Sequence, residues 1–204
     1  MGIIFAMTLT ASAQFGKNAH NIPIYRHFNN TGELRLHVAG ELGFADLGGL
    51  FMHEMPYHYS IGGMVEYQTS RCISLGLGTE FYGTRHIDHE PFTNGRYLNC
   101  VPVYANVRAN TTGRTRFFIE ARVGYAIPTN HFYVSALNAD VATQGFYTGA
   151  AVGLMFYGNN ISVGFNSLDV VNASSHEPVY QHHGDRKLIA TDFYLRYSYA
   201  FPLN

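Results

Sequence analysis

Histidine has the widest range of possible chemistry in this sequence, where it occurs eleven times. His86-Ile-Asp-His89 and His182-His183-Gly-Asp185 each set imidazole near carboxylate, and both groups bind transition metals. Neither spacing matches a specific metal-binding motif. We therefore predict no metal and no cofactor, and keep metal or haem capture as an alternative. Eight histidines belong to or border polar connecting segments: His53, His58, His86, His89, His131, His176, His182 and His183.

A second candidate site is the pair His58-Tyr-Ser60, because a histidine beside a serine can activate its hydroxyl group as a nucleophile. Such a pair also needs an acid that orients the histidine and a group that stabilises the oxyanion. Glu54 or Glu66 could be that acid, but no convincing complete set is visible in the sequence. We predict that the protein is not an enzyme and has no catalytic residues, with a hydrolase as the alternative.

Single charged residues recur on strand faces that are otherwise rich in Gly, Ser and Ala. The acidic members are Glu41, Glu66, Glu80, Glu120 and Asp192, and the basic members are Arg35, Arg108, Arg122 and Arg196. The two signs nearly balance. Charges enclosed in a narrow space are tolerated only when they are paired and hydrogen-bonded. The pattern predicts a network of ion pairs that fills an interior, with these nine residues as its members.

The elements that must position these charges are β-strands, because the hydrophobic pattern from Glu33 onward has a period of two. In one segment Ile73, Leu75 and Leu77 alternate with Ser74 and Gly76. Eight such segments are expected, at 34–44, 57–68, 72–84, 101–109, 117–125, 146–156, 161–166 and 189–201. The pattern slips at residues 167–168, which suggests a β-bulge.

The connections between these segments alternate in length. Short turns are expected at 70–71, 110–115 and 158–160, and long polar loops at 45–56, 85–95, 128–143 and 173–187. Short turns at one end and long loops at the other are typical of transmembrane barrels. We therefore predict an all-β fold, an eight-stranded antiparallel up-and-down transmembrane β-barrel with a filled polar interior, over residues 33–204.

Composition indicates which face of the barrel points outward. Only 13% of the residues are charged, about half of the roughly 25% usual in soluble proteins. The polar face is too sparsely charged to cover a soluble barrel, so we expect the aliphatic face to contact lipid. Seven tyrosines near strand ends fit an aromatic girdle: Tyr57, Tyr59, Tyr67, Tyr97, Tyr125, Tyr197 and Tyr199. Cys72 and Cys100 lie at different heights of one hairpin and are expected to be free thiols.

The N-terminal segment has the features of an export signal. Residues 2–11 form a short apolar run, and Ala11-Ser-Ala13 resembles a small-residue cleavage site. We predict a residual signal peptide over residues 1–13 and a periplasmic arm over 14–32, with both barrel termini in the periplasm. The net charge of −1 offers no field that would attract nucleic acid, so no nucleic-acid partner is expected.

Two segments carry a resemblance to a known family: Val101-Pro-Val-Tyr-Ala-Asn-Val-Arg108 and Ala121-Arg-Val-Gly-Tyr125. They resemble the small outer-membrane β-barrel proteins of the Bacteroidota, which are similar in architecture to the OmpX and OmpA barrels. The resemblance implies a place in the cell outer membrane. Members of that family include orphan structural barrels and accessory subunits of secretion or barrel-assembly complexes.

The pair His58 and Ser60 also resembles the His-x-Ser pair of outer-membrane lipid A deacylases, although Ile61 stands where that family has Asn. We predict that the protein acts as a structural or accessory subunit. Its partners would be outer-membrane lipid and other proteins, bound through the long loops, the lipid-facing wall or the N-terminal arm. Gly40, Gly63 and Gly83 on the apolar face are expected to let a neighbouring protein approach closely.

Overall fold

The structure is a computed structural model that describes residues 31–46, 57–85, 97–112, 115–134, 139–179 and 189–203. The predicted signal at 1–13, residues 14–30 of the predicted arm and most of the long loops lie outside the described residues. Of the arm, Gly32 is described, and its backbone N–H donates to the carbonyl oxygen of Gln68 at 2.8 Å. No described segment forms a helix long and apolar enough to cross a membrane.

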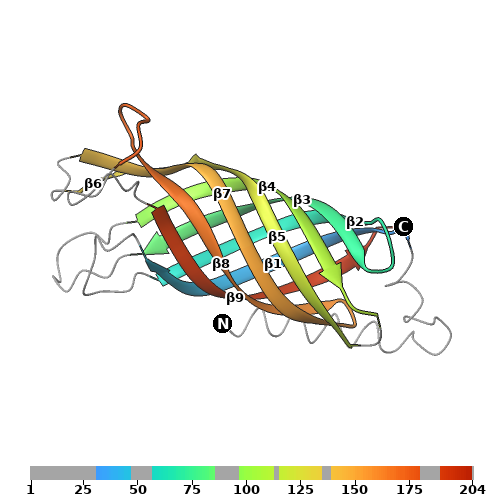
Figure 1. The fold of residues 1–204 in the computed structure, drawn as a ribbon. Coiled ribbons are helices and arrows are strands. Elements are labelled where there is room, and N and C mark those ends of the chain that lie inside the picture. The colour runs from blue at the N-terminus through green and yellow to red at the C-terminus, as the bar shows by residue number, and fades with distance from the viewer. Residues whose placement is uncertain are drawn as a thin grey trace.

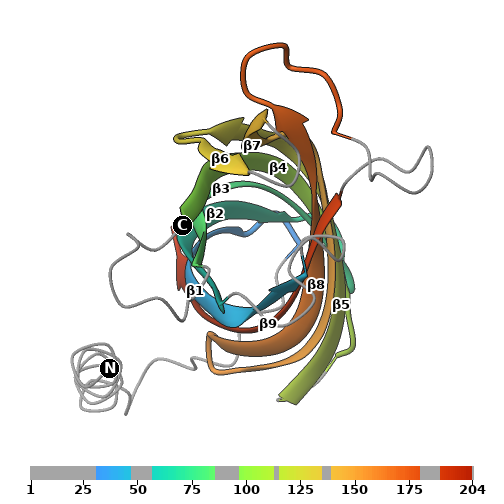
Figure 2. The same cartoon turned by 90° about the vertical axis from the view of Figure 1, so that its left-hand side faces the viewer.

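The described chain forms nine strands in one antiparallel sheet (Figure 1). They are β1 (Leu34–Asp46), β2 (Tyr57–Gln68), β3 (Ile73–Arg85), β4 (Tyr97–Asn110), β5 (Thr115–Pro128), β6 (Phe132–Val134), β7 (Ala139–Phe156), β8 (Asn159–Asn172) and β9 (Ile189–Pro202). Strand β9 pairs with β1, and β5 pairs with β7, so eight strands close on themselves. The short β6 pairs only with β7 and stands outside this ring (Figure 2). The predicted eight-stranded antiparallel barrel is confirmed.

The hairpin between β7 and β8 shows how local sequence fixes the turn end of the barrel. Tyr157 and Gly158 both have positive φ, at 51° and 83°, as a two-residue hairpin turn of the I′ kind requires. The side chain of Asn159 donates to the carbonyl oxygen of Phe156 at 3.2 Å and holds the turn. The turn is therefore tighter than the predicted 158–160, because Asn159 and Asn160 already belong to β8.

Two expectations about β7 and β8 were wrong. The predicted loop at 128–143 contains β6 and the first five residues of β7, because these residues pair with each other. The irregularity lies in β7, where the register shifts between Thr143 and Tyr147 around Gly145, whose φ is 119°. Strand β8 keeps its alternation: its inner face only changes from polar to apolar, with Leu168 and Val170.

The two faces of the barrel have the predicted character. Leu77, Phe117 and Ile119 point outward and are 71%, 66% and 65% exposed, whereas the charged residues between such positions are buried inside. Tyr57, Tyr67 and Tyr125 are about half exposed near strand ends. Four further tyrosines lie inside the barrel instead: Tyr82, Tyr104, Tyr147 and Tyr194. Both cysteines are free thiols, as predicted, with Cys72 exposed and Cys100 buried.

Candidate functional site

The strongest candidate site is the barrel interior, where the alternation of each strand directs its charged residues. The structure places all nine predicted members there, each at most 5% exposed. They are Arg35, Glu41, Glu66, Glu80, Arg108, Glu120, Arg122, Asp192 and Arg196. Eight of the nine form ion pairs with one another, and Asp192 does not.

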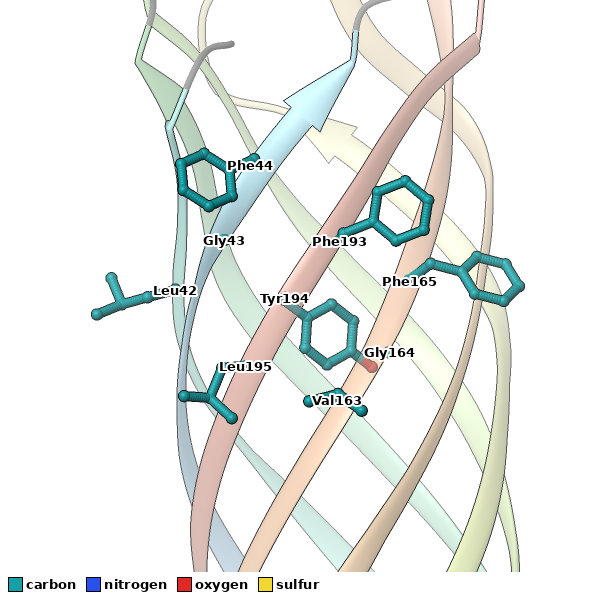
Figure 3. A pocket seen from close by; sticks show the side chains of 9 residues that line it. All are labelled: Leu42, Gly43, Phe44, Val163, Gly164, Phe165, Phe193, Tyr194 and Leu195. Atoms are coloured by element: carbon teal, nitrogen blue, oxygen red, sulfur yellow. The ribbon is translucent and has the colours of Figure 1, made fainter.

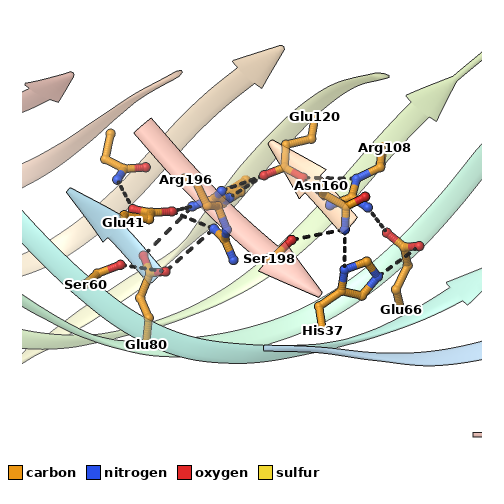
Figure 4. Close-up of polar contacts among 12 residues, drawn as sticks. His37, Glu41, Ser60, Glu66, Glu80, Arg108, Glu120, Asn160, Arg196 and Ser198 are labelled. Atoms are coloured by element: carbon orange, nitrogen blue, oxygen red, sulfur yellow. Dashed lines mark hydrogen bonds and ion pairs between the residues drawn. The ribbon is translucent and has the colours of Figure 1, made fainter. Parts of the chain in front are cut away.

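The central cluster is organised by Glu41 of β1 (Figure 4). Its Oε1 accepts from Nη1 of Arg122 at 2.9 Å and from Nη1 of Arg196 at 2.7 Å. Arg122 lies on β5, which is four strands from β1 in the closed ring of eight, so this pair joins opposite walls of the barrel. Glu80 completes the cluster at 3.8 Å from Arg196 and accepts from the hydroxyl of Tyr147 at 2.9 Å.

A second cluster lies toward the short-turn end and is connected to the first through Glu120. This carboxylate accepts from Arg122 through Oε1 at 2.6 Å and from Arg108 through Oε2 at 2.7 Å. Arg108 continues to Glu66 at 3.0 Å, and Glu66 lies 3.6 Å from Arg35. The ion pairs thus run without a break along a large part of the interior, and nearly every charge has a partner, as buried charges require.

Three further interior residues were not among the nine predicted members of the network: Glu33, His37 and Arg116. Glu33 pairs with Arg35 at 2.8 Å, and His37 lies 3.4 Å from Glu66 through Nε2. The nitrogen Nδ1 of His37 is also 3.4 Å from the side-chain amide of Asn160. The period of two could have identified all three. Glu33 and His37 each lie two residues from Arg35, and Arg116 lies four residues before Glu120, so each shares a strand face with a predicted inward residue.

Tyrosine rings fill the interior space around the charges, and glycines on the inner face make room for them. A Cβ atom added at Gly78 would lie 2.7 Å from the Tyr104 ring, and one added at Gly164 would lie 2.6 Å from the Tyr194 hydroxyl. The guanidinium of Arg122 lies 5.5 Å from the centroids of both rings. The small residues of the polar face are therefore sites where a ring from a neighbouring strand packs.

The loop end of the interior is apolar, which the sequence analysis did not predict. Residues from β4, β5, β7, β8 and β9 form this apolar cluster, and each is at most 1% exposed. Its members are Leu98, Cys100, Ala126, Val141, Leu168, Val170 and Ala190. Val179, beyond β8, packs against it, and the N–H of Val179 donates to the carbonyl oxygen of Val170 at 3.3 Å. The charged network therefore ends below an apolar layer on the loop side.

His58 and Ser60 also lie inside the barrel, at 1% and 6% exposure. His58 is thus a buried strand residue, in agreement with its place at the start of the expected segment 57–68. Its ring stacks on Tyr82 with centroids 4.5 Å apart, and the Ser60 hydroxyl donates to Glu80 at 3.5 Å. Both side chains take part in interior packing, and a lipid ester would have to enter the barrel to reach them.

The two histidine pairs named as possible metal ligands, His86 with His89 and His182 with His183, lie outside the described residues. His131 and His176 are exposed and belong to different connections. His53 also lies outside the described residues. Within the described ranges, no group of three or more His, Cys, Asp or Glu side chains could hold a metal ion.

The outer wall carries one shallow apolar groove of about 520 Å³ across β1, β9 and β8 (Figure 3). Its outward side chains form two rows, one of Phe44, Phe193 and Phe165 and one of Leu42, Leu195 and Val163. No charged side chain lines it. The groove therefore offers contact area to an apolar neighbour but no groups for chemistry.

Gly40, Gly63 and Gly83 differ in how open they are. A Cβ atom added at Gly40 would meet only the carbonyl oxygen of Ser60, at 3.8 Å. At Gly83 an added Cβ would lie 2.5 Å from the ring of Tyr59, which packs over it from β2. Gly83 is therefore covered by the barrel's own side chain, and the expectation that a neighbour could approach there was wrong.

Comparison with solved structures identifies the same fold. The chain aligns with Neisserial surface protein A at a TM-score of 0.51 and 8% identity, over 82% of this chain and 97% of that one. It aligns with the outer membrane enzyme PagL at 0.49 and 16%, over 80% and 98%. The N-terminal β-barrel domain of Pseudomonas aeruginosa OprF aligns at 0.46 and 11%, over 84% and 98%. No family model matches the sequence, and no curated protein matches it significantly. The fold is that of the eight-stranded outer-membrane barrels.

Proposed function

We propose that this protein is a non-enzymatic β-barrel of a bacterial outer membrane, of the Bacteroidota type, that acts as a structural or accessory subunit of a membrane complex. The observation that carries the proposal is the arrangement of the two faces: aliphatic side chains cover the outside, and paired charges fill the inside. Such an exterior is stable in lipid and unstable in water. The eight ring strands have 12 to 18 residues, enough to cross a bilayer at the usual tilt.

The ion pairs also support a lumen that does not conduct. Arg122 reaches Glu41 on the opposite wall, and Arg108 reaches from β4 to Glu66 on β2. Opening a solute path would require these pairs to separate inside a medium of low dielectric constant. Planar-bilayer recordings of the reconstituted protein should therefore show no large stable channels. Regular conductance steps in such recordings would overturn this part of the proposal.

Because the lumen is filled, we infer that the protein acts through contacts with partners. A filled interior offers no transport path, so contact surfaces remain: the outer wall, the long connections and the N-terminal arm. Long connections are more often functional or disordered than idle. In this proposal both termini and the short turns face the periplasm. Gly40, which is open to the outside, marks one stretch of wall where another protein could approach closely.

The test of this role is gentle detergent extraction from the native membrane, followed by native mass measurement and identification of co-purifying proteins. We expect a complex larger than the barrel. Gly40→Leu should fold normally, because its side chain points outward into open space, and should reduce the amount of complex. Ala105→Leu, an outward change on β4 on the other side of the barrel, is the matched control. Recovery of the wild-type protein only as a monomer would contradict the proposal.

The hydrolase alternative is separable by one substitution. Ser60→Ala removes the hydroxyl that His58 could activate. If His58 and Ser60 were catalytic, the mass profile of lipid A in a membrane extract would therefore change. We expect no change, because both side chains are buried among interior residues.

A further inference from the structure

Asp192 of β9 has no positively charged partner among the interior residues that the structure describes. Among the described residues the buried acids are Glu33, Glu41, Glu66, Glu80, Glu120 and Asp192, and the buried guanidinium groups are Arg35, Arg108, Arg116, Arg122 and Arg196. Each of the five glutamates lies within 4.0 Å of an arginine. Within these described residues no ion pair involves Asp192, so they include one buried carboxyl group more than there are buried arginines.

The described residues around Asp192 supply a hydrogen bond but no cation. Its Oδ2 accepts from the hydroxyl of Tyr82 on β3, and its Oδ1 has no hydrogen-bond partner although the residue is fully buried. Asn166 of β8 and Ala45 of β1 are its partners in register. The nearest arginine on its own inner face is Arg196, four residues away, and that guanidinium is already held by Glu41 at 2.7 Å. The other ionisable groups on this side are Glu41, Glu80, Cys100 and His58.

A bare carboxylate in such a place would be costly, because removing an unpaired ion from water costs several kcal/mol even after the protein relaxes. His58 is one group that could carry a compensating proton. An imidazolium, however, needs acceptors for two N–H groups: Nε2 of the buried His58 lies 3.9 Å from Oε2 of Glu41, but its Nδ1 has no hydrogen-bond partner. A neutral carboxyl group has no charge to be compensated, and its Oδ2 can still accept from the hydroxyl of Tyr82.

We propose that the loop-side interior contains a proton-binding site, in which the carboxyl group of Asp192 holds a proton at neutral pH and accepts a hydrogen bond from the hydroxyl of Tyr82. The remaining five carboxylates and five guanidinium groups then balance. The inference concerns the charge state of the interior and stands whether or not the protein acts through partners. It makes folding take up one proton, because Asp192 is ionised in the unfolded chain above about pH 4.

Infrared spectroscopy of the full-length protein in vesicles tests the site directly. At neutral pH the wild-type protein should show the C=O stretching band of a protonated carboxyl group. The band should be absent in Asp192→Asn and present in Asp169→Asn, a matched change at a partly exposed aspartate of the neighbouring strand β8. Tyr82→Phe should keep the band and shift its frequency, which provides a readout even if Asp192→Asn fails to fold.

Unfolding measurements give the second readout. The folded wild-type protein holds a proton that the unfolded chain releases, so its stability relative to Asp192→Asn should fall as pH rises. The unfolding equilibrium constant of the wild type, divided by that of the variant, should increase about tenfold per pH unit between about pH 5 and about pH 7. Absence of the band in the wild type, its loss in Glu80→Gln instead, or a ratio that depends on added sodium or potassium instead of pH would each overturn the proposal.

Discussion

The inner and outer faces of the barrel are made by alternate residues of the same strands, yet they obey different rules. Leu77 and Gly78 are neighbours in β3: Leu77 is 71% exposed on the outer wall, and Gly78 lies under the ring of Tyr104. The outer wall needs apolar character and no particular partner. Inner positions such as Gly78 and Glu41 are matched to particular side chains. The difference teaches that the outside should tolerate a change of shape but no charge, whereas the inside should tolerate neither.

The largest loss of stability is expected when the interior ion-pair network loses Arg122. Arg122→Met leaves Glu41 and Glu120 each short of one buried partner and should reduce the free energy of unfolding by about 3–5 kcal/mol. Urea unfolding in detergent or lipid measures this value. Arg71→Met, at an exposed turn position, is the control and should stay within about 0.5 kcal/mol of the wild type. A loss below about 1 kcal/mol for Arg122→Met would show that the network contributes little.

A somewhat smaller effect is expected from a charge on the outer wall. Leu77→Arg should cost about 2–4 kcal/mol if residue 77 lies near the bilayer midplane, because the guanidinium would face hydrocarbon. Leu77→Ile, which keeps the apolar character and changes the shape, should cost much less. Folding yield into lipid vesicles and urea unfolding measure both variants. If Leu77→Arg folds as readily as the wild type, the assignment of this face to lipid is wrong.

The smallest loss of stability is expected when one methyl group is added to a glycine, and its size should differ between the inner and the outer face. Gly78→Ala places a Cβ atom 2.7 Å from the Tyr104 ring and should cost about 1–3 kcal/mol through overpacking. Gly40→Ala on the outer wall places its Cβ 3.8 Å from the nearest atom and should change stability by less than about 0.5 kcal/mol. Thermal or urea unfolding of the two variants in parallel decides the point. Equal losses would mean that inner and outer glycines do not differ in packing.

Much of the fold was readable from the sequence because a β-strand reports its environment with a period of two. The alternation predicted eight strands, their approximate bounds and the inward position of nine charged residues, since each depends only on neighbouring residues along one strand. The bulge was misplaced for the same reason. An apolar inner residue such as Leu168 imitates a slip of the pattern, and only the register against β7 shows that β8 is regular.

The tertiary structure alone decided which inner residues meet. Glu41 and Arg122 are 81 positions apart, and their contact depends on the ring closing between β5 and β7. Closure also determined that Tyr59 covers Gly83, that an apolar cluster fills part of the loop end, and that Asp192 contacts Tyr82 but no arginine of the described residues. The sequence by itself determined which face each residue belongs to, because that is a property of one strand. Its partner across the interior depends on strand order, register and barrel diameter together, and no single strand contains that information.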